Sequence, residues 1–406
     1  MRGVRMGETI MVLGLLLVVA TFLGRAARLV GLPTVPVYIL TGLAAGAANS
    51  FLPVHLAYED VHVLAVIGLV LLLFHLGLEF DTAAFAKNAR TLVTAGVAYI
   101  ALNVGAGLLL GFALGWGAPE ALAVAGITGI SSSAIVTKLM FDLKKLARPE
   151  APLILGIIVI EDVFLAVYLA VLNTVINPAG SLWASAVRFA VSVGFLVFLF
   201  VLARRGSKIV SRIVNEKTAE LFVVGLVGIT LFIAGMAEEV GVSDAIGAFM
   251  VGLIVAGTNA KHRAETTIGP LRDTFAAVFF VGFGLTLDPG SFGGVLTPVL
   301  LAVAVSIVVN LIAGVVAARV QDMPALIGAE IGLTLLSRGE FALIVATIAA
   351  TAGLDERIMP FAGLYVLILG ILGPLLVTYA PRLWNQPRQP SPDQAPAELS
   401  TASRPA

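Results

Sequence analysis

Glu161 and Asp162 are adjacent acids in the middle of an apolar run that extends from Ala151 to Val175. The run is long enough to cross a bilayer, because about 20 helical residues span the hydrocarbon layer. An ionised carboxylate near the centre of that layer costs at least about 2.5 kcal/mol, and two neighbouring carboxylates also repel each other. One bound proton or cation would relieve both costs. The pair is therefore a candidate site for a proton or a cation, with one acid facing a cavity and the other facing the bundle.

A stretch of hydroxyl side chains interrupts an earlier apolar span. The residues concerned are Thr128, Ser131, Ser132 and Ser133. Hydroxyl oxygens and freed backbone carbonyls are hard ligands, so they suit Na⁺ or K⁺ better than a soft metal ion. A second polar interruption, from Thr334 to Glu340, has the corresponding position in the other half of the chain. Broken helices are tolerated at membrane depth only where protein buries them or where they line a cavity, so we predict two broken helices. Packing of small residues between helices is the alternative interpretation.

Three further polar residues fall inside apolar spans: Arg338, Glu340 and Asn310. Arginine stays protonated in proteins, so a buried Arg338 is expected to pair with an acid such as Glu340, Glu161 or Asp162. Such a pair would hold the two halves together or take part in ion binding. Asn310 would either donate a hydrogen bond to a carboxylate or link neighbouring helices.

Several acids lie close to the predicted ends of spans. For these residues we expect solvated positions without a chemical role: Glu79, Asp81, Asp244 and Glu330.

The composition is that of a membrane protein. Of the 406 residues, 59% are hydrophobic and 12% are charged, whereas soluble domains average about 45–50% and 25%. The net charge of +0 gives no electrostatic support for binding nucleic acid. Cysteine is absent, which excludes disulfides and thiol chemistry, and the four histidines have no ligand spacing. No nucleophile and base stand together, so we expect a protein that is not an enzyme.

Hydropathy predicts about thirteen transmembrane helices in an all-α protein. The spans are expected near residues 8–30, 34–50, 60–80, 90–114, 119–138, 151–176, 183–204, 218–240, 244–258, 270–287, 294–318, 323–351 and 358–380. An odd number suits two inverted six-helix units around a linker helix, here 183–204. Residues 381–406 read as a short disordered tail.

The loops that follow odd-numbered spans hold most of the 25 Lys and Arg residues. By the positive-inside rule, this bias predicts an N-terminus outside the cell and a cytoplasmic C-terminus.

Four segments together resemble the monovalent cation:proton antiporters, in particular the second subfamily with the Kef-type potassium efflux transporters. They are Leu73–Asp81 (LFHLGLEFD), Gly247–Leu253 (GAFMVGL), Phe279–Leu287 (FFVGFGLTL) and Arg338–Ala342 (RGEFA). The similarity extends from about residue 8 to 380.

The resemblance implies a sodium/proton antiporter-like fold with two crossing broken helices, within a transmembrane domain of residues 1–380. A scaffold of about residues 8–80 and 218–287 would form a homodimer, and a core of about 90–176 and 294–380 would move. The family's ion ligand maps onto Asp162 and its helix break onto Thr128–Ser133. Glu161 and Asn310 depart from the family pattern, since electrogenic members carry a lysine near position 310. The soluble nucleotide-binding domain of many Kef-type proteins is missing, which implies no gating or a separate cytoplasmic regulatory subunit.

The sequence thus predicts secondary antiport of K⁺ or Na⁺ against H⁺ by alternating access, for cation and pH homeostasis at the cell membrane. The transported ions would be the only small ligands, lipid would surround the protein, and nucleic acid would play no part. A gated, potassium channel-like efflux pathway is the alternative. A channel would show a continuous polar stripe or a carbonyl filter, and the sequence has neither.

Overall fold

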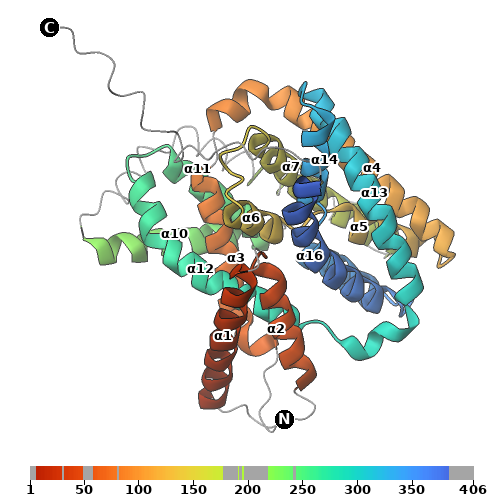
Figure 1. Ribbon diagram of the computed structural model, residues 1–406, viewed down its shortest axis with the longest axis horizontal. Coiled ribbons are helices and arrows are strands. Elements are labelled where there is room, and N and C mark those ends of the chain that lie inside the picture. The colour runs from red at the N-terminus through yellow and green to blue at the C-terminus, as the bar shows by residue number, and fades with distance from the viewer. Residues whose placement is uncertain are drawn as a thin grey trace.

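The computed structural model describes residues 6–29, 32–48, 58–79, 82–176, 191, 194–195, 218–240 and 244–383, and within these ranges all regular structure is helical. The elements form two packed groups (Figure 1). In chain order they are α1 (Met6–Leu29), α2 (Val35–Ala48), α3 (Tyr58–Glu79), α4 (Thr82–Leu114), α5 (Ala118–Gly129), α6 (Ser133–Asp142), α7 (Ala151–Ile176), α10 (Ala219–Glu239), α11 (Asp244–Ala256), α12 (Lys261–Leu285), the 3-10 turn η1 (Pro289–Gly294), α13 (Leu296–Val320), α14 (Ala325–Thr334), α15 (Glu340–Thr351) and α16 (Ile358–Leu383). Nine segments of the described ranges are long and apolar enough to cross a membrane.

The helices follow the predicted spans closely. The two polar interruptions do break their helices, the first between α5 and α6 and the second between α14 and α15. The sequence places the starts of α4 and α12 too late, at residues 90 and 270 instead of Thr82 and Lys261. Hydropathy detects only the apolar part of a helix, whereas the backbone hydrogen bonds continue into its polar end. The predicted linker helix 183–204 and the tail 384–406 lie outside the described residues.

The first packing group consists of α1, α2, α3, α10, α11 and α12. Glycine lets two of its helices approach closely: a methyl group built at Gly77 of α3 would lie 2.2 Å from the carbonyl oxygen of Phe249. One built at Gly252 of α11 would lie 2.1 Å from the carbonyl oxygen of Phe74. These glycines belong to two of the four segments that carry the family resemblance, so those segments pack against each other.

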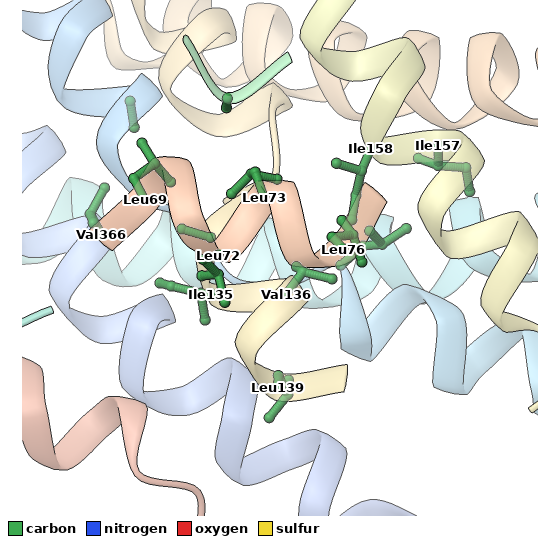
Figure 2. Packing of buried hydrophobic residues seen from close by; sticks show 14 of the residues in the cluster. Leu69, Leu72, Leu73, Leu76, Ile135, Val136, Leu139, Ile157, Ile158 and Val366 are labelled. Carbon is green, nitrogen blue, oxygen red and sulfur yellow. The ribbon is translucent and has the colours of Figure 1, made fainter. Parts of the chain in front are cut away.

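The second packing group consists of α4, α5, α7, α13, α14, α15 and α16. The short helix α6 lies between the two groups and packs on α2 and α3 (Figure 1). Figure 2 shows the apolar contact at this boundary, where α3, α6, α7 and α16 contribute to one buried cluster. The labelled side chains are Leu69, Leu72, Leu73, Leu76, Ile135, Val136, Leu139, Ile157, Ile158 and Val366.

A few polar contacts tie α6 to the first group near its C-terminal end. Lys138 forms ion pairs with Asp142 on its own helix, at 3.0 Å, and with Asp273 of α12, at 3.5 Å. The hydroxyl of Thr34, just before α2, donates to Asp142 at 3.0 Å. We refer to Thr34, Lys138, Asp142 and Asp273 as the α6 boundary contacts.

The prediction that Glu330 ends its helix in solvent is wrong. Its carboxylate is buried and lies 3.2 Å from Lys145 Nζ and 3.0 Å from Arg148 Nη1. Both cations come from the loop between α6 and α7, which covers α14 and excludes solvent. Asp244 is half-buried at the first position of α11, whereas the side chains of Glu79 and Asp81 lie outside the described part of the chain.

Candidate functional site

The two helix breaks meet inside the protein. The backbone N–H of Ser132, between α5 and α6, donates to the carbonyl oxygen of Ser337, between α14 and α15, at 2.8 Å. Ile130 and Ser132 are extended, which ends α5 and aims the chain at the other break. This bond satisfies two of the backbone groups that helix ends leave free. We call this meeting of the two breaks the crossing.

Two short side chains allow the crossing to be tight. Ser132 caps α6, because its hydroxyl oxygen accepts from the N–H of Ile135 at 3.3 Å. Gly339 packs directly on this serine, since a methyl group built at Gly339 would lie 2.3 Å from Ser132 Oγ. A larger residue at 339 would therefore push the two breaks apart.

Arg338 holds the free carbonyl oxygens of both breaks together. Its Nε donates to Thr128 O at 2.9 Å, and its Nη1 donates to Leu335 O at 2.8 Å and to Leu336 O at 3.1 Å. The side chain is 0% exposed. These carbonyls lie at the C-terminal ends of α5 and α14, where the helix dipoles favour a positive charge.

The expectation that Arg338 pairs with an acid is not met by the described side chains. Its Nη2 donates to Asn103 Oδ1 at 3.3 Å, and neither Glu161 nor Asp162 forms a salt bridge with it. The side chain of Glu340, at the start of α15, lies outside the described residues. Among the described atoms, the guanidinium group is held by neutral oxygens.

Glu161 reaches the crossing from α7. Its Oε1 accepts from the N–H of Ser131 at 3.2 Å and lies 3.0 Å from the Ser131 hydroxyl, which also donates to Leu335 O at 2.9 Å. Glu161 is 1% exposed, and its Oε2 has no hydrogen-bond partner in the described structure. Leaving a buried carboxylate oxygen unpartnered is costly, so this atom is suited to a proton or a cation.

The other predicted ligands lie around this point. Asp162 is 5% exposed, follows Glu161 on α7 and therefore projects about 100° away around the helix. The hydroxyl of Thr128 donates to Val124 O at 2.9 Å, so it is engaged within α5. The buried hydroxyl oxygen of Ser133 has no partner among the described atoms. The crossing thus brings together Glu161, several hydroxyl and carbonyl oxygens and the guanidinium group of Arg338, and Asp162 is the next residue along α7.

Asn310 does not contact a carboxylate in the described structure. Its amide donates to Asn103 Oδ1 at 3.0 Å and to Ser306 O at 2.7 Å, and its Oδ1 accepts from the Tyr99 hydroxyl. Of the two alternatives, the link between helices is therefore correct.

Sequence reasoning missed Tyr99 and Asn103 of α4, which join Asn310 to Arg338. The two residues are four positions apart in an apolar helix, and Asn103 Nδ2 donates to Tyr99 O at 3.0 Å. Polar residues at this spacing share one face of a transmembrane helix, and that signal would have found them.

Comparisons with known proteins identify the family of this chain. The family model described as sodium/hydrogen exchanger, transmembrane, matches residues 14–379. The K⁺/H⁺ antiporter subunit KhtU of Bacillus subtilis strain 168 is 40% identical over 328 residues, which cover 80% of this chain and 81% of KhtU. The ammonium/H⁺ antiporter subunit AmhT of Alkalihalophilus pseudofirmus is 29% identical, over 92% of this chain and 93% of AmhT.

A solved structure shows the same fold. The sodium proton antiporter MjNhaP1 from Methanocaldococcus jannaschii superposes with a TM-score of 0.70 at 17% identity, and the match covers 92% of this chain and 97% of MjNhaP1. Together with the nine apolar helices, these similarities establish a multi-pass membrane protein with an antiporter fold. The match over residues 14–379 shows that the chain belongs to the sodium/hydrogen exchanger family, whose members are cation:proton antiporters and not enzymes.

Proposed function

We propose that this protein exchanges K⁺ or Na⁺ for H⁺ by alternating access, with the ion site at the crossing. The observation that carries the proposal is Glu161, which is 1% exposed and hydrogen-bonded to Ser131 at the crossing, with Asp162, 5% exposed, next to it on α7. The Oε2 atom of Glu161 has no hydrogen-bond partner among the described residues, and a buried carboxylate needs a neutralising partner. A bound cation or proton supplies one.

Asp162 binds the cation and the proton in competition. Hydroxyl and carbonyl oxygens between Thr128 and Ser133 complete the cation's shell, as hard donors suit an alkali ion. Glu161, held by Ser131, tunes the site or contributes a second acid. Either bound ion reduces the net charge at membrane depth, so the loaded protein crosses between its two states more easily than the empty one. This competition couples the two fluxes.

The two packing groups provide the parts for alternating access. The first group, within about residues 8–80 and 218–287, is the scaffold, and the second, within about 90–176 and 294–380, is the moving core. The scaffold forms a homodimer in the cell membrane, with the N-terminus outside and the C-terminus in the cytoplasm. A separate cytoplasmic subunit regulates the exchange, in keeping with the word subunit in the names of KhtU and AmhT.

The relatives differ in the cation that their names give. KhtU is named for K⁺, AmhT for ammonium and MjNhaP1 for sodium. Each is a monovalent cation, which matches a site where one carboxylate binds either a cation or a proton. The channel alternative finds no support among these relatives.

The test is proton flux into proteoliposomes, recorded with a pH-sensitive dye. K⁺, Na⁺ and ammonium are added in turn to wild type and to Asp162→Asn. We expect a cation-triggered pH change in the wild type that the variant loses. Full exchange by Asp162→Asn would show that the site is elsewhere, and large single-channel currents would replace antiport with conduction.

A further inference from the structure

A chain of neutral hydrogen bonds runs from α13 through α4 to the crossing. Asn310 Nδ2 donates to Asn103 Oδ1 at 3.0 Å, and the same oxygen accepts from Arg338 Nη2 at 3.3 Å. The Tyr99 hydroxyl donates to Asn310 Oδ1. Asn310 is 0% exposed and Asn103 is 3% exposed, so water does not compete for these bonds.

These hydrogen bonds fix the direction of the amide groups of Asn103 and Asn310. Asn103 Nδ2 is committed to the backbone of Tyr99, at 3.0 Å, which turns Asn103 Oδ1 towards Asn310 and Arg338. Asn310 Nδ2 also donates to Ser306 O at 2.7 Å. Reversing the Asn103 amide would place its donors against those of Asn310 and Arg338. Reversing the Asn310 amide would place its oxygen against Asn103 Oδ1 and Ser306 O, so each amide has a single favourable orientation.

This arrangement balances the Arg338 charge without a described carboxylate. A buried guanidinium group ordinarily needs an acid, but here three carbonyls and Asn103 accept its hydrogen bonds. Glu161 is close enough to interact with Arg338 through its charge, yet it is hydrogen-bonded to Ser131. The neutral acceptors therefore leave Glu161 Oε2, which has no hydrogen-bond partner among the described atoms, available for an ion.

We propose that Asn310 is a positioning residue of the ion site. Through Asn103 it holds Arg338 on the carbonyls of the two breaks and away from Glu161 and Asp162. The inference rests on the proposed function, because it assigns these acids to transported ions. Without Asn310, the Asn103 amide is held only by its bond to Tyr99 O, so Asn103 Oδ1 is fixed less firmly and Arg338 turns towards the nearest acid. Arg338 then competes with the cation, and more cation is needed to fill the site.

The test compares the cation concentration for half-maximal exchange in proteoliposomes of wild type, Asn310→Leu and Asn310→Val. Both substitutions are close to asparagine in size and remove the two amide donors without adding a charge. Loss of one or two buried neutral hydrogen bonds corresponds to about a threefold to tenfold change in an equilibrium constant. We expect an increase of that size in the half-maximal concentration, with the maximal rate per folded transporter within about twofold of wild type.

Two more variants separate positioning from packing. Tyr99→Phe keeps the ring and removes only the hydroxyl that Asn310 accepts, so a smaller increase of about twofold is expected. Thr230→Val is the matched control: it removes a buried hydroxyl on α10 that bonds only to Leu226 O, and it should leave the half-maximal concentration unchanged. Tyr99→Phe also keeps the inference testable if the Asn310 variants do not fold.

Binding is measured independently, as the rise in unfolding temperature of purified protein with K⁺ or Na⁺ concentration. If wild type binds a cation but does not exchange it, the proposed function fails while binding by the variants still tests Asn310. Folded variants of Asn310 and Tyr99 with wild-type cation dependence would overturn the inference. A lower maximal rate with an unchanged cation concentration for half-maximal exchange would also overturn it, because it would show that Asn310 contributes only to packing.

Discussion

The crossing and the α6 boundary contacts hold helices together in different ways. At the crossing, a backbone bond joins Ser132 to Ser337, and Arg338, which is 0% exposed, meets carbonyls of both breaks. At the boundary, Lys138 reaches Asp273 at 3.5 Å, and the side chain of Asp273 is 54% exposed. The first set of contacts is buried and mutually supporting, whereas the link from Lys138 to Asp273 is long and open to water on the Asp273 side.

The difference indicates which contacts persist and which break when the two packing groups move relative to each other. Solvated ion pairs contribute little to stability and break at little cost. Buried, fully hydrogen-bonded charges are costly to disturb, because a lost partner leaves a charge or a carbonyl without water. Motion between the two packing groups would therefore use the boundary and keep the crossing intact.

The largest loss of stability at the crossing is expected for Arg338→Leu. The change removes the donors to Thr128, Leu335 and Leu336, so we expect the free energy of unfolding to fall by at least about 3 kcal/mol. Arg338→Lys keeps the charge but cannot form the planar fork, so its loss should be intermediate. Thermal unfolding in detergent measures both. A loss below about 1 kcal/mol for the leucine variant would mean that the crossing does not depend on Arg338.

Glu330→Gln tests a second buried charge, at the loop between α6 and α7. Lys145 would lose its buried partner, while Arg148 is partly solvated, so we expect a loss of about 2 kcal/mol near neutral pH. Glu265→Gln is the control, since its partners Lys261 and His262 are 41% and 90% exposed and its loss should stay within about 0.5 kcal/mol. Equal losses in the two variants would contradict the difference between buried and solvated pairs.

The same variant has a defined pH dependence. Burial lowers the pKa of Lys145, and the Glu330 carboxylate partly raises it again. A lysine whose folded-state pKa lies below its unfolded value binds fewer protons when folded, so stability rises with pH through that window. Removing Glu330 lowers the folded-state pKa further. The deficit of Glu330→Gln should therefore shrink from neutral to alkaline pH, and a growing deficit in pH-dependent unfolding would contradict this assignment.

A smaller effect is expected from one methyl group at the crossing. Gly339→Ala places a carbon 2.3 Å from Ser132 Oγ, which should cost about 1–3 kcal/mol of stability. Gly105→Ala on α4 meets open space and should be neutral or stabilising by up to about 1 kcal/mol. If the crossing is tight, the unfolding temperature falls in Gly339→Ala and does not fall in Gly105→Ala. If Ser132 moves aside, the two variants change in the same direction.

The smallest change in stability is expected at the boundary. Asp273→Asn removes an exposed ion-pair partner of Lys138, so unfolding should change by less than about 1 kcal/mol. Because the contact joins the two groups, we expect faster exchange in proteoliposomes, by less than about fivefold. A stability loss as large as that of Arg338→Leu, with an unchanged rate, would remove the distinction between the two regions.

Local patterns made the helices and their breaks predictable. Apolar runs bounded the spans, and the hydroxyl-rich stretch near Ser131 and the polar stretch near Arg338 marked the breaks, because each signal lies within a few residues. The partners of Arg338 were not predictable from side chains. They are mainly carbonyls, which become free acceptors only because the helices stop there.

Contacts distant in sequence were also hidden. Asn103 and Asn310 are 207 positions apart, and either residue alone reads as an isolated polar side chain. The environment of Glu330 was predicted wrongly because its position close to the end of a span suggested contact with solvent. The loop that contains Lys145 covers it instead. A sequence pattern reports the environment along one helix. The contacts of Asn103, Asn310 and Glu330 depend on segments that are distant in sequence and pack against that helix.

Competition between a cation and a proton for Asp162 is the central claim, and proton release measures it most directly. Purified protein in weakly buffered detergent solution receives K⁺ or Na⁺, and a pH dye records the protons that leave. We predict release by the wild type that saturates with cation concentration and disappears in Asp162→Asn. Saturable cation binding without proton release, or release retained in Asp162→Asn, would contradict the account.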